Sequence, residues 1–238
     1  VSISPNGSMI ATVDYNQPVL DMRFYNVESG TLIRSFAGGF SISRQWTVVL
    51  TGRKESCFWQ IGADMVLSPL DCQSTQYKKL SPDGTQWSYS SAIFNRENGT
   101  IRKIDFKDGV ANDFWSHREF SNSGSMLACV NGDWSLGVWD THTGDQLSLM
   151  PNDFYLSGDT LIFSPTGDAI ATGNYLGGQI RDARSGEWLG SFNGGSSSFG
   201  QISRLLFSPD GRIVYSNGVL LYNLFDQSET SCGAYSCA

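Results

Sequence analysis

Short apolar segments alternate with turn sequences along residues 119–149. Met126–Val130 and Leu136–Asp140 are apolar runs of strand length, and residues 146–149 begin another. The sequences between them are rich in Asn and Gly, which tolerate the positive φ of tight turns. The segment therefore predicts one antiparallel meander of four short strands.

The same kind of turn recurs along the chain. Each copy opens with a serine, and successive serines are 39, 38, 40, 43 and 44 residues apart. The six serines are Ser4, Ser43, Ser81, Ser121, Ser164 and Ser208. A Pro-X-Gly or similar sequence follows the serine except at residues 44–46, which break the pattern. Pro presets φ at the first turn position and Gly closes the turn, so the motif indicates turn formation and not catalysis.

A second anchor, best represented by Trp139-Asp140, follows each serine. The six pairs are Tyr25-Asn26, Trp59-Gln60, Ile104-Asp105, Trp139-Asp140, Arg181-Asp182 and Tyr222-Asn223. Four residues later comes a glycine in four copies: Gly30, Gly109, Gly144 and Gly186. Two anchors in phase over six copies predict one all-β domain over residues 1–238, with about six four-stranded antiparallel sheets.

The fourth copy carries a resemblance to a known family on Leu127-Ala128, Val138-Trp139-Asp140 and Thr143-Gly144. It resembles a WD repeat, and the resemblance implies a β-propeller in which each repeat forms one blade. The family usually has a Gly-His pair whose His joins a buried polar network with a Ser or Thr. Neither His117 nor His142 stands at that position, and Cys129 stands where the family has Ser or Thr. The resemblance is therefore to a divergent member that is stabilised by apolar packing.

Closure of the ring is a further expectation from the resemblance. Such rings are commonly closed by a strand from one terminus that completes the blade at the other. The chain begins at the innermost strand of the first copy, and the tail after Asn223 has weak strand character. We therefore expect a piece of a longer polypeptide, with an incomplete ring whose sixth copy is the least ordered.

Charge and hydropathy argue against two classes of partner, nucleic acid and membrane. The formal net charge is −7, with acidic residues spread through the turns, which disfavours nonspecific binding to nucleic acid or to an anionic membrane. No apolar run approaches the roughly 18–20 residues of a membrane helix. The resulting expectation is an intracellular protein, cytoplasmic or nuclear, that binds neither nucleic acid nor membrane.

The five cysteines leave two alternatives open. Cys57 and Cys129 fall inside predicted strands and are interpreted as small buried hydrophobes, and Cys72 lies between repeats. Cys232 and Cys237 lie close together in the tail, where either a disulfide or two reduced thiols fit.

Catalytic patterns do not emerge from the chain. The stretch Gly194-Gly195-Ser196 lacks the Lys and the following helix of a phosphate loop, and neither His lies near a nucleophile elbow. Asp105 and Asp108 fall where Asp caps turns. We expect no enzyme activity, no cofactor and no metal, and the alternative is a propeller hydrolase or quinoprotein-like oxidoreductase with its site at the central channel.

A protein-interaction scaffold is the favoured function. The resemblance implies that partners bind on one rim of the channel, formed by the loops after the second strands. The serine-to-Trp-position distance is longer in copies one and three, which predicts insertions there. Aromatic and Arg side chains are common interface anchors. The expected contacts with a protein or peptide are Asp14, Tyr15, Phe94, Arg96, Glu97, Asp133, Trp134, Asn174 and Tyr175.

Overall fold

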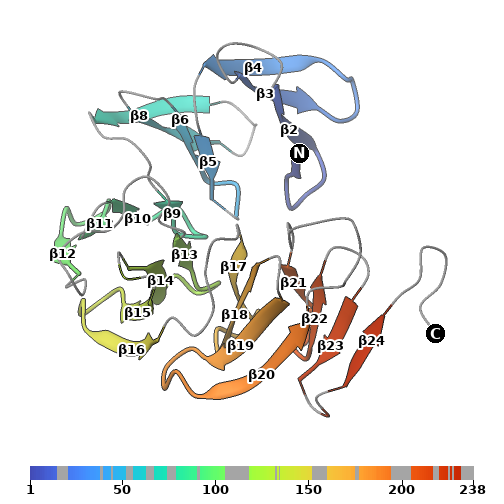
Figure 1. The fold of residues 1–238 in the computed structure, drawn as a ribbon. Helices are drawn as coiled ribbons and strands as arrows, with labels where there is room; N and C mark the ends of the chain where they lie inside the picture. Colours follow the sequence, from blue (N-terminus) through green and yellow to red (C-terminus); the bar gives the residue numbers. More distant parts are fainter. Residues whose placement is uncertain are drawn as a thin grey trace. The chain divides into compact units, whose positions relative to one another are not determined.

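The structure is a computed structural model of the 238-residue chain. It describes residues 1–14, 21–37, 40–43, 45–51, 56–62, 67–73, 79–89, 92–104, 118–131, 133, 135–151, 160–174, 177–193, 205–216, 220–224, 226 and 228–231. Strands and turns account for the regular structure of these residues, and none of them is helical. The predicted all-β class is confirmed (Figure 1).

The described strands form six four-stranded sheets, and in each sheet the strand order follows the chain. The first three sheets consist of β1 (Ser2–Ile3), β2 (Met9–Asp14), β3 (Asp21–Asn26) and β4 (Leu32–Ala37); of β5 (Phe40–Ile42), β6 (Val48–Thr51), β7 (Ser56–Ile61) and β8 (Leu67–Gln73); and of β9 (Lys79–Leu80), β10 (Gln86–Tyr89), β11 (Ala92–Asn95) and β12 (Ile101–Lys103).

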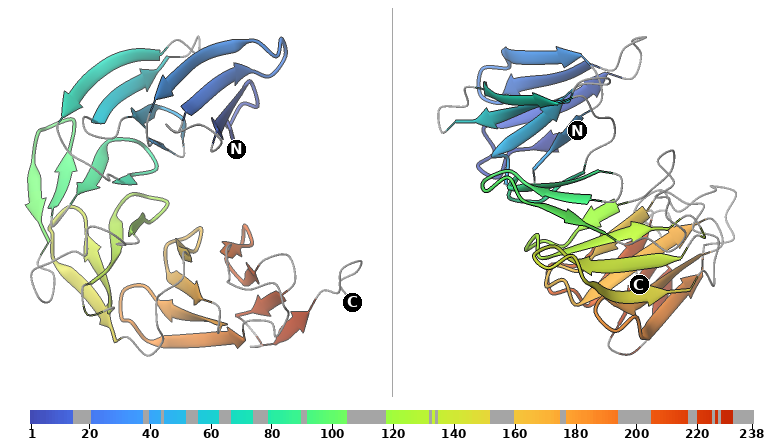
Figure 2. Two further views of the ribbon diagram at one scale, coloured as in Figure 1. Left: turned by 45° about the horizontal axis from the view of Figure 1, so that its top comes forward. Right: turned by 90° about the vertical axis from the view of Figure 1, so that its left-hand side faces the viewer.

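The other three sheets consist of β13 (Arg118–Phe120), β14 (Met126–Val130), β15 (Leu136–Asp140) and β16 (Gln146–Met150); of β17 (Thr160–Phe163), β18 (Ala169–Asn174), β19 (Gly177–Asp182) and β20 (Trp188–Asn193); and of β21 (Leu205–Phe207), β22 (Ile213–Ser216), β23 (Leu220–Asn223) and β24 (Glu229–Ser231). Neighbouring strands run antiparallel, as in β17–β20, where each strand lies beside its neighbour in the chain (Figure 2). The predicted four-stranded meander is therefore present along the chain.

A bulge recurs in the fourth strand of four sheets, opposite the Trp position of the third strand. The pairing with the fourth strand shifts register between Val138 and Trp139, directly before the Trp position of the repeat. The same shift occurs at Phe24/Tyr25, Phe58/Trp59 and Ile180/Arg181. The extra residue belongs to the fourth strand, Leu147 in β16, and such an insertion bends the strand and increases its twist. The repeat therefore includes a backbone irregularity, at a constant position, that the hydrophobic pattern does not reveal.

The chain divides into two compact units. The first comprises residues 1–89 and 94–101, and the second residues 90–93 and 102–238. In the first unit, Met22 and Phe24 of the first sheet pack with Trp46 and Val49 of the second. A second cluster joins the second and third sheets, with Phe58 beside Trp87 at a ring-centroid distance of 4.7 Å. Apolar faces between successive sheets are thus the core of this unit.

The second unit is built in the same way. Val138 and Met150 of the fourth sheet share a buried cluster with Phe163 and Ile170 of the fifth. Another cluster joins the fifth and sixth sheets through Phe192 and Tyr222 and others. Burial of such side chains contributes roughly 1.5–3 kcal/mol each. Apolar packing between sheets therefore stabilises both units.

One predicted anchor is wrong. Ile104-Asp105 was expected to hold the Trp-Asp position of the third copy, but Ile104 follows the fourth strand, β12. The pair at the end of the third strand, β11, is Phe94-Asn95, and Gly99 stands four residues after Asn95 with φ 67°. Asn95 caps the turn as Asp does in other copies, because both side chains accept bonds from the following backbone.

Candidate functional site

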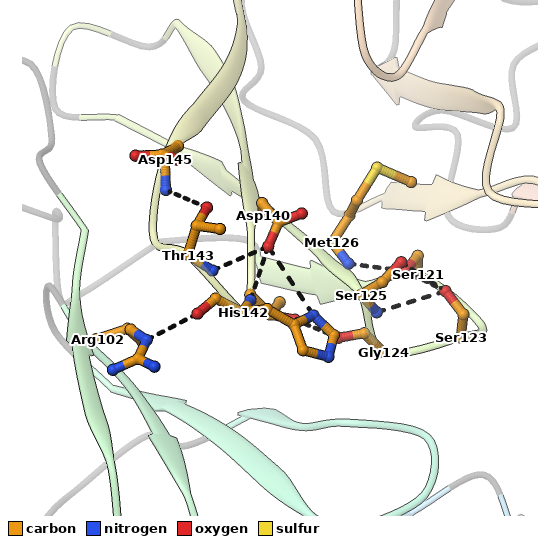
Figure 3. A network of polar contacts seen from close by, with 11 residues as sticks. Arg102, Ser121, Ser123, Gly124, Ser125, Met126, Asp140, His142, Thr143 and Asp145 are labelled. Atoms are coloured by element: carbon orange, nitrogen blue, oxygen red, sulfur yellow. Dashed lines mark hydrogen bonds and ion pairs between the residues drawn. The ribbon is translucent and has the colours of Figure 1, made fainter.

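Each repeat carries a serine turn between its first and second strands. In the fourth sheet, Ser121 Oγ accepts the Met126 N–H at 3.0 Å, and the Ser121 N–H donates to the Met126 carbonyl at 2.9 Å (Figure 3). The Gly124 N–H donates to the Ser121 carbonyl at 2.8 Å, and Gly124 has φ 74°. Ser121 is fully buried. One serine therefore satisfies three backbone groups and closes the turn.

The same bonds repeat in other copies. The serine Oγ accepts the N–H five residues on at 2.9–3.0 Å for Ser4, Ser43, Ser81 and Ser164. The second copy keeps the turn although it lacks glycine, because Trp46 takes the glycine's place with φ 57° and donates to the Ser43 carbonyl. Trp46 is the one non-glycine residue of the described chain with positive φ. The Pro-X-Gly pattern is thus dispensable there, whereas the serine is kept.

A second turn follows the third strand and uses the Asp or Asn of the repeat. Asp140 Oδ1 accepts the N–H groups of His142 at 2.8 Å and Thr143 at 3.0 Å (Figure 3). Partial burial raises the pKa of Asp140, but these N–H groups and the nearby His142 outweigh it, so the pKa lies below its usual value. Asn95 and Asp182 accept equivalent bonds. These side chains hold a turn and are not placed for proton transfer.

The two turns of the fourth sheet lie side by side. Thr141 Oγ1 donates to the Gly124 carbonyl at 2.7 Å, and the Thr141 N–H donates to the Ser125 carbonyl at 3.0 Å. We call the end of each sheet that carries these two turns the turn end, and the opposite end the loop end. The turn end is thus tied together by hydrogen bonds between its own residues.

Connection lengths distinguish the two ends. At the turn end, five residues separate the first strand from the second, and the third from the fourth, in all six sheets. At the loop end, the second and third strands are separated by 6, 4, 2, 5, 2 and 3 residues in chain order. The connections to the next sheet also lie there, and span 2, 5, 14, 9 and 11 residues. Length is therefore constant at one end and variable at the other.

The structure places three of the predicted site residues at the loop end. Asp14 is the last residue of β2, Asn174 is the last of β18, and Asp133 lies between β14 and β15. Tyr15, Trp134 and Tyr175 lie outside the described residues. Asp14 and Asn174 thus end their second strands and Asp133 follows one, and the role of all three in binding stays a prediction.

Phe94, Arg96 and Glu97 lie elsewhere. They were expected after the second strand, but Phe94 belongs to the third strand, β11. Arg96 and Glu97 lie in the turn that follows, where the Arg96 N–H donates to the Thr85 carbonyl at 2.8 Å. Phe94 stacks on Trp87 with ring centroids 5.4 Å apart. These three residues therefore do not belong with Asp133, because residues 90–91 connect β10 to β11 without the predicted insertion.

Asp133 accepts two hydrogen bonds inside the β14–β15 loop. Its Oδ1 accepts the Ser135 N–H at 2.9 Å and the Ser135 hydroxyl at 2.5 Å. Asn131 Nδ2 donates to Ser135 Oγ at 2.8 Å, and both Asn131 and Ser135 are buried. Asn131 Oδ1 has no hydrogen-bond partner. Asp133 therefore shapes the β14–β15 loop from within, a role that the sequence pattern did not suggest.

The sequence pattern placed Arg181 at an anchor but did not indicate that this arginine is buried in the core. Arg181 takes the Trp position of the fifth copy and is 8% exposed. Its Nε donates to Gln179 Oε1 at 3.0 Å, one of its terminal nitrogens donates to the Gly186 carbonyl at 3.1 Å, and its guanidinium lies 5.2 Å from the Trp188 ring centroid. Arg181 therefore fills a core position with a charge that polar groups and a ring surround.

The cysteines differ from the prediction at two positions. Cys72, expected between repeats, lies in β8, the fourth strand of the second sheet. Cys129 is a free buried thiol, and burial raises its pKa to about 12, with Arg118 opposing the rise. Cys57, expected to be a small hydrophobe, is disulfide-bonded. Cys232 and Cys237 lie outside the described residues. A raised pKa makes the Cys129 thiol unreactive as a nucleophile.

Neither a metal-ligand cluster nor a membrane-spanning helix occurs in the described part of the chain. No three His, Cys, Asp or Glu side chains gather there as a metal ion would need. The same residues include no helix with the length and hydrophobicity for a membrane crossing. His142 is exposed, with Nδ1 3.9 Å from Asp140 Oδ1, and His117 lies outside the described residues.

Comparison with protein-family models gives no match for this chain, and comparison with curated proteins gives none either. The fold alone therefore defines the class of the protein. It is an all-β chain of four-stranded antiparallel sheets whose turn ends follow one hydrogen-bond scheme.

Proposed function

We propose that the chain is a WD-repeat-like β-propeller that acts as a non-enzymatic scaffold and binds a protein or peptide at its loop ends. The observation that carries the proposal is the contrast in connection length between the two ends of the sheets. Loops that are free of packing duty can vary to fit a partner, and binding residues are commonly found on them. The turn ends are constant because their side chains are engaged in holding the turns.

The candidate surface includes Asp14, Asp133 and Asn174, which lie at loop ends, and Tyr15, Trp134 and Tyr175, which we propose because each follows one of them in the sequence. Asp14 and Tyr15 belong to the first compact unit and the other four residues to the second, so each unit carries its own part of the candidate surface. Trp and Tyr are favoured anchors because they bury a large area with few rotatable bonds. Phe94, Arg96 and Glu97 are left out of this surface, because they lie at or beside a turn end.

The enzyme alternative receives less support. The repeated carboxylates Asp140 and Asp182 accept backbone hydrogen bonds in their turns, and Asp83 does the same in a serine turn. Their positions follow from turn formation, so no catalytic role is needed to explain them. A scaffold accounts for the variable loops without assigning a reaction to them.

The test uses a displayed library of random peptides, selected on the immobilised 238-residue chain. Affinity of a selected peptide is then measured by calorimetry for Trp134→Ala and Tyr175→Ala. At least one variant is expected to bind about thirtyfold more weakly, because a desolvated aromatic anchor is worth about 2 kcal/mol and 1.4 kcal/mol is tenfold. Glu28→Ala and Glu97→Ala are matched controls at turn ends, where both side chains are exposed.

Two results would contradict the proposal. One is a selected peptide whose affinity falls with Glu28→Ala and Glu97→Ala but not with the loop-end variants. The other is a failure to select any peptide from a library that yields binders to a control propeller in parallel. Thermal melting of each variant separates a loss of binding from a loss of folding.

A further inference from the structure

Cys57 lies in β7 of the second sheet and is disulfide-bonded. The antiparallel register of β7 and β8 places Cys72 directly opposite Cys57. The strand order of this sheet makes β8 its edge strand. The question that the structure raises is which of the four other cysteines is the partner.

The backbone positions favour Cys72. Residues directly opposite in an antiparallel pair have Cα atoms about 4.5–5.5 Å apart, and a disulfide needs about 4.4–6.8 Å. Opposite residues also direct their side chains to the same face of a sheet. Cys129 is excluded because it is a free thiol. Within the described part of the chain, Cys72 is the remaining cysteine, and the register already brings it to Cys57.

We propose that Cys57 and Cys72 form a cross-strand disulfide that ties the edge strand β8 to β7. The bond closes a loop of residues 58–71. This loop includes Trp59. The Arg34 guanidinium lies 4.7 Å from the centroid of the Trp59 ring, and the ring centroids of Trp59 and Phe36, in the first sheet, are 4.8 Å apart. The disulfide therefore braces the edge of the sheet beside the contact between the first two sheets.

The bond forms by thiol–disulfide exchange with a small-molecule disulfide such as oxidised glutathione. The thiolate of one cysteine attacks the oxidant, forms a mixed disulfide and releases one glutathione thiol. The second cysteine attacks the mixed disulfide, and the second glutathione thiol leaves. The two cysteines lose two protons and two electrons, and the oxidant gains them. Such a bond counts against the cytoplasmic or nuclear location expected from the sequence, because thiols there are kept reduced.

Peptide mapping tests the pairing. The 238-residue chain is equilibrated with reduced and oxidised glutathione, its free thiols are blocked with N-ethylmaleimide, and it is digested with trypsin. No Lys or Arg lies between Lys54 and Lys78, so both cysteines fall on one peptide of residues 55–78. The expected result is an unblocked peptide that is lighter by two hydrogens than its reduced form. A blocked Cys57, or a link from residues 55–78 to the peptide that carries Cys232 and Cys237, would overturn the proposal.

Melting temperatures give an independent readout. Closing a loop of this length should raise the melting temperature by about 6–12 °C in a chain of this size. We therefore expect dithiothreitol to lower the melting temperature of the unmodified chain by that amount. Cys57→Ala/Cys72→Ala should remove the response, and Cys232→Ser/Cys237→Ser should keep it. If the response disappears with the tail cysteines instead, the disulfide has been assigned to the wrong pair.

Discussion

Trp46 lies in the second serine turn and combines a large side chain with the positive φ that usually favours glycine. Substitutions at this position test whether the turn imposes that backbone conformation. Trp46 has φ 57°, at the position where other copies have glycines with φ 71–84°. Its side chain is 6% exposed and packs edge-on against Phe24, with ring centroids 6.0 Å apart. The ring stabilises the core while the backbone is strained. We therefore expect Trp46→Gly to be more stable than Trp46→Ala.

The magnitudes follow from these two opposing contributions. Removing a buried Trp side chain costs about 3–5 kcal/mol, and both variants lose it. A left-handed backbone costs a non-glycine residue about 1–2 kcal/mol, which Ala retains and Gly avoids. Gly loses up to about 1 kcal/mol of this advantage through its larger unfolded-state entropy. The Gly variant should therefore exceed the Ala variant by up to about 1 kcal/mol, or about 2–4 °C in melting temperature.

The measurement is urea unfolding followed by far-UV circular dichroism, with m-values compared between variants. Trp87 is the matched control, because it is also 6% exposed but lies in strand β10 and is not among the residues with positive φ. Gly in a strand is about 0.5–1 kcal/mol worse than Ala. Trp87→Ala should therefore be more stable than Trp87→Gly. If Ala is also the better replacement at Trp46, the turn does not impose a left-handed backbone there.

Three further perturbations address the repeat itself. Ser121→Ala should cost about 1–3 kcal/mol in urea unfolding, because the buried Met126 N–H loses its acceptor, whereas exposed Ser123→Ala should stay within about 0.5 kcal/mol. Gly137→Ala should lower the free energy of unfolding by about 1–3 kcal/mol, because the new Cβ would lie 2.1 Å from the Trp139 ring. An unchanged melting temperature in calorimetry would refute the clash. The Ser185 N–H and hydroxyl lower the pKa of Asp182, so its contribution to stability is present above the unfolded-state pKa and is lost as pH falls through the folded-state pKa. Asp182→Asn keeps the acceptor and should reduce the loss of stability between about pH 5 and pH 2, measured as unfolding midpoints against pH.

The turn ends could be predicted because their hydrogen bonds are local. Ser121 reaches Met126 five residues on, and Asp140 reaches Thr143, so the residue types alone indicate the geometry. The third copy was assigned wrongly although its signal was present in the sequence. Asn95 with Gly99 four residues later has the same spacing as Asp140 with Gly144. That spacing is the signal by which the sequence identifies the third-copy turn.

The remaining features depend on contacts between distant residues. Local preference argues against a Trp at positive φ, and Trp46 is held there by Phe24 in the neighbouring sheet. The Cys57 disulfide depends on a cross-strand register that spacing does not reveal. At the loop ends the sequence predicts where length varies. What a loop binds depends on the surface of a partner, which leaves no periodic pattern in this chain.

The five-residue turns have a consequence for how such a chain can grow. The bonds of the serine itself lie within a segment of six residues, from Ser121 to Met126 in the fourth copy, while Asn122 Nδ2 donates to the Pro165 carbonyl of the next copy. A duplicated stretch of DNA encoding one repeat would carry the bonds of its own serine with it and would need a matching apolar face and a neighbouring turn on each side. Recombination between copies would be tolerated for the same reason, with new loops supplied by the unequal ends. The architecture is therefore suited to diversification by shuffling of whole repeats.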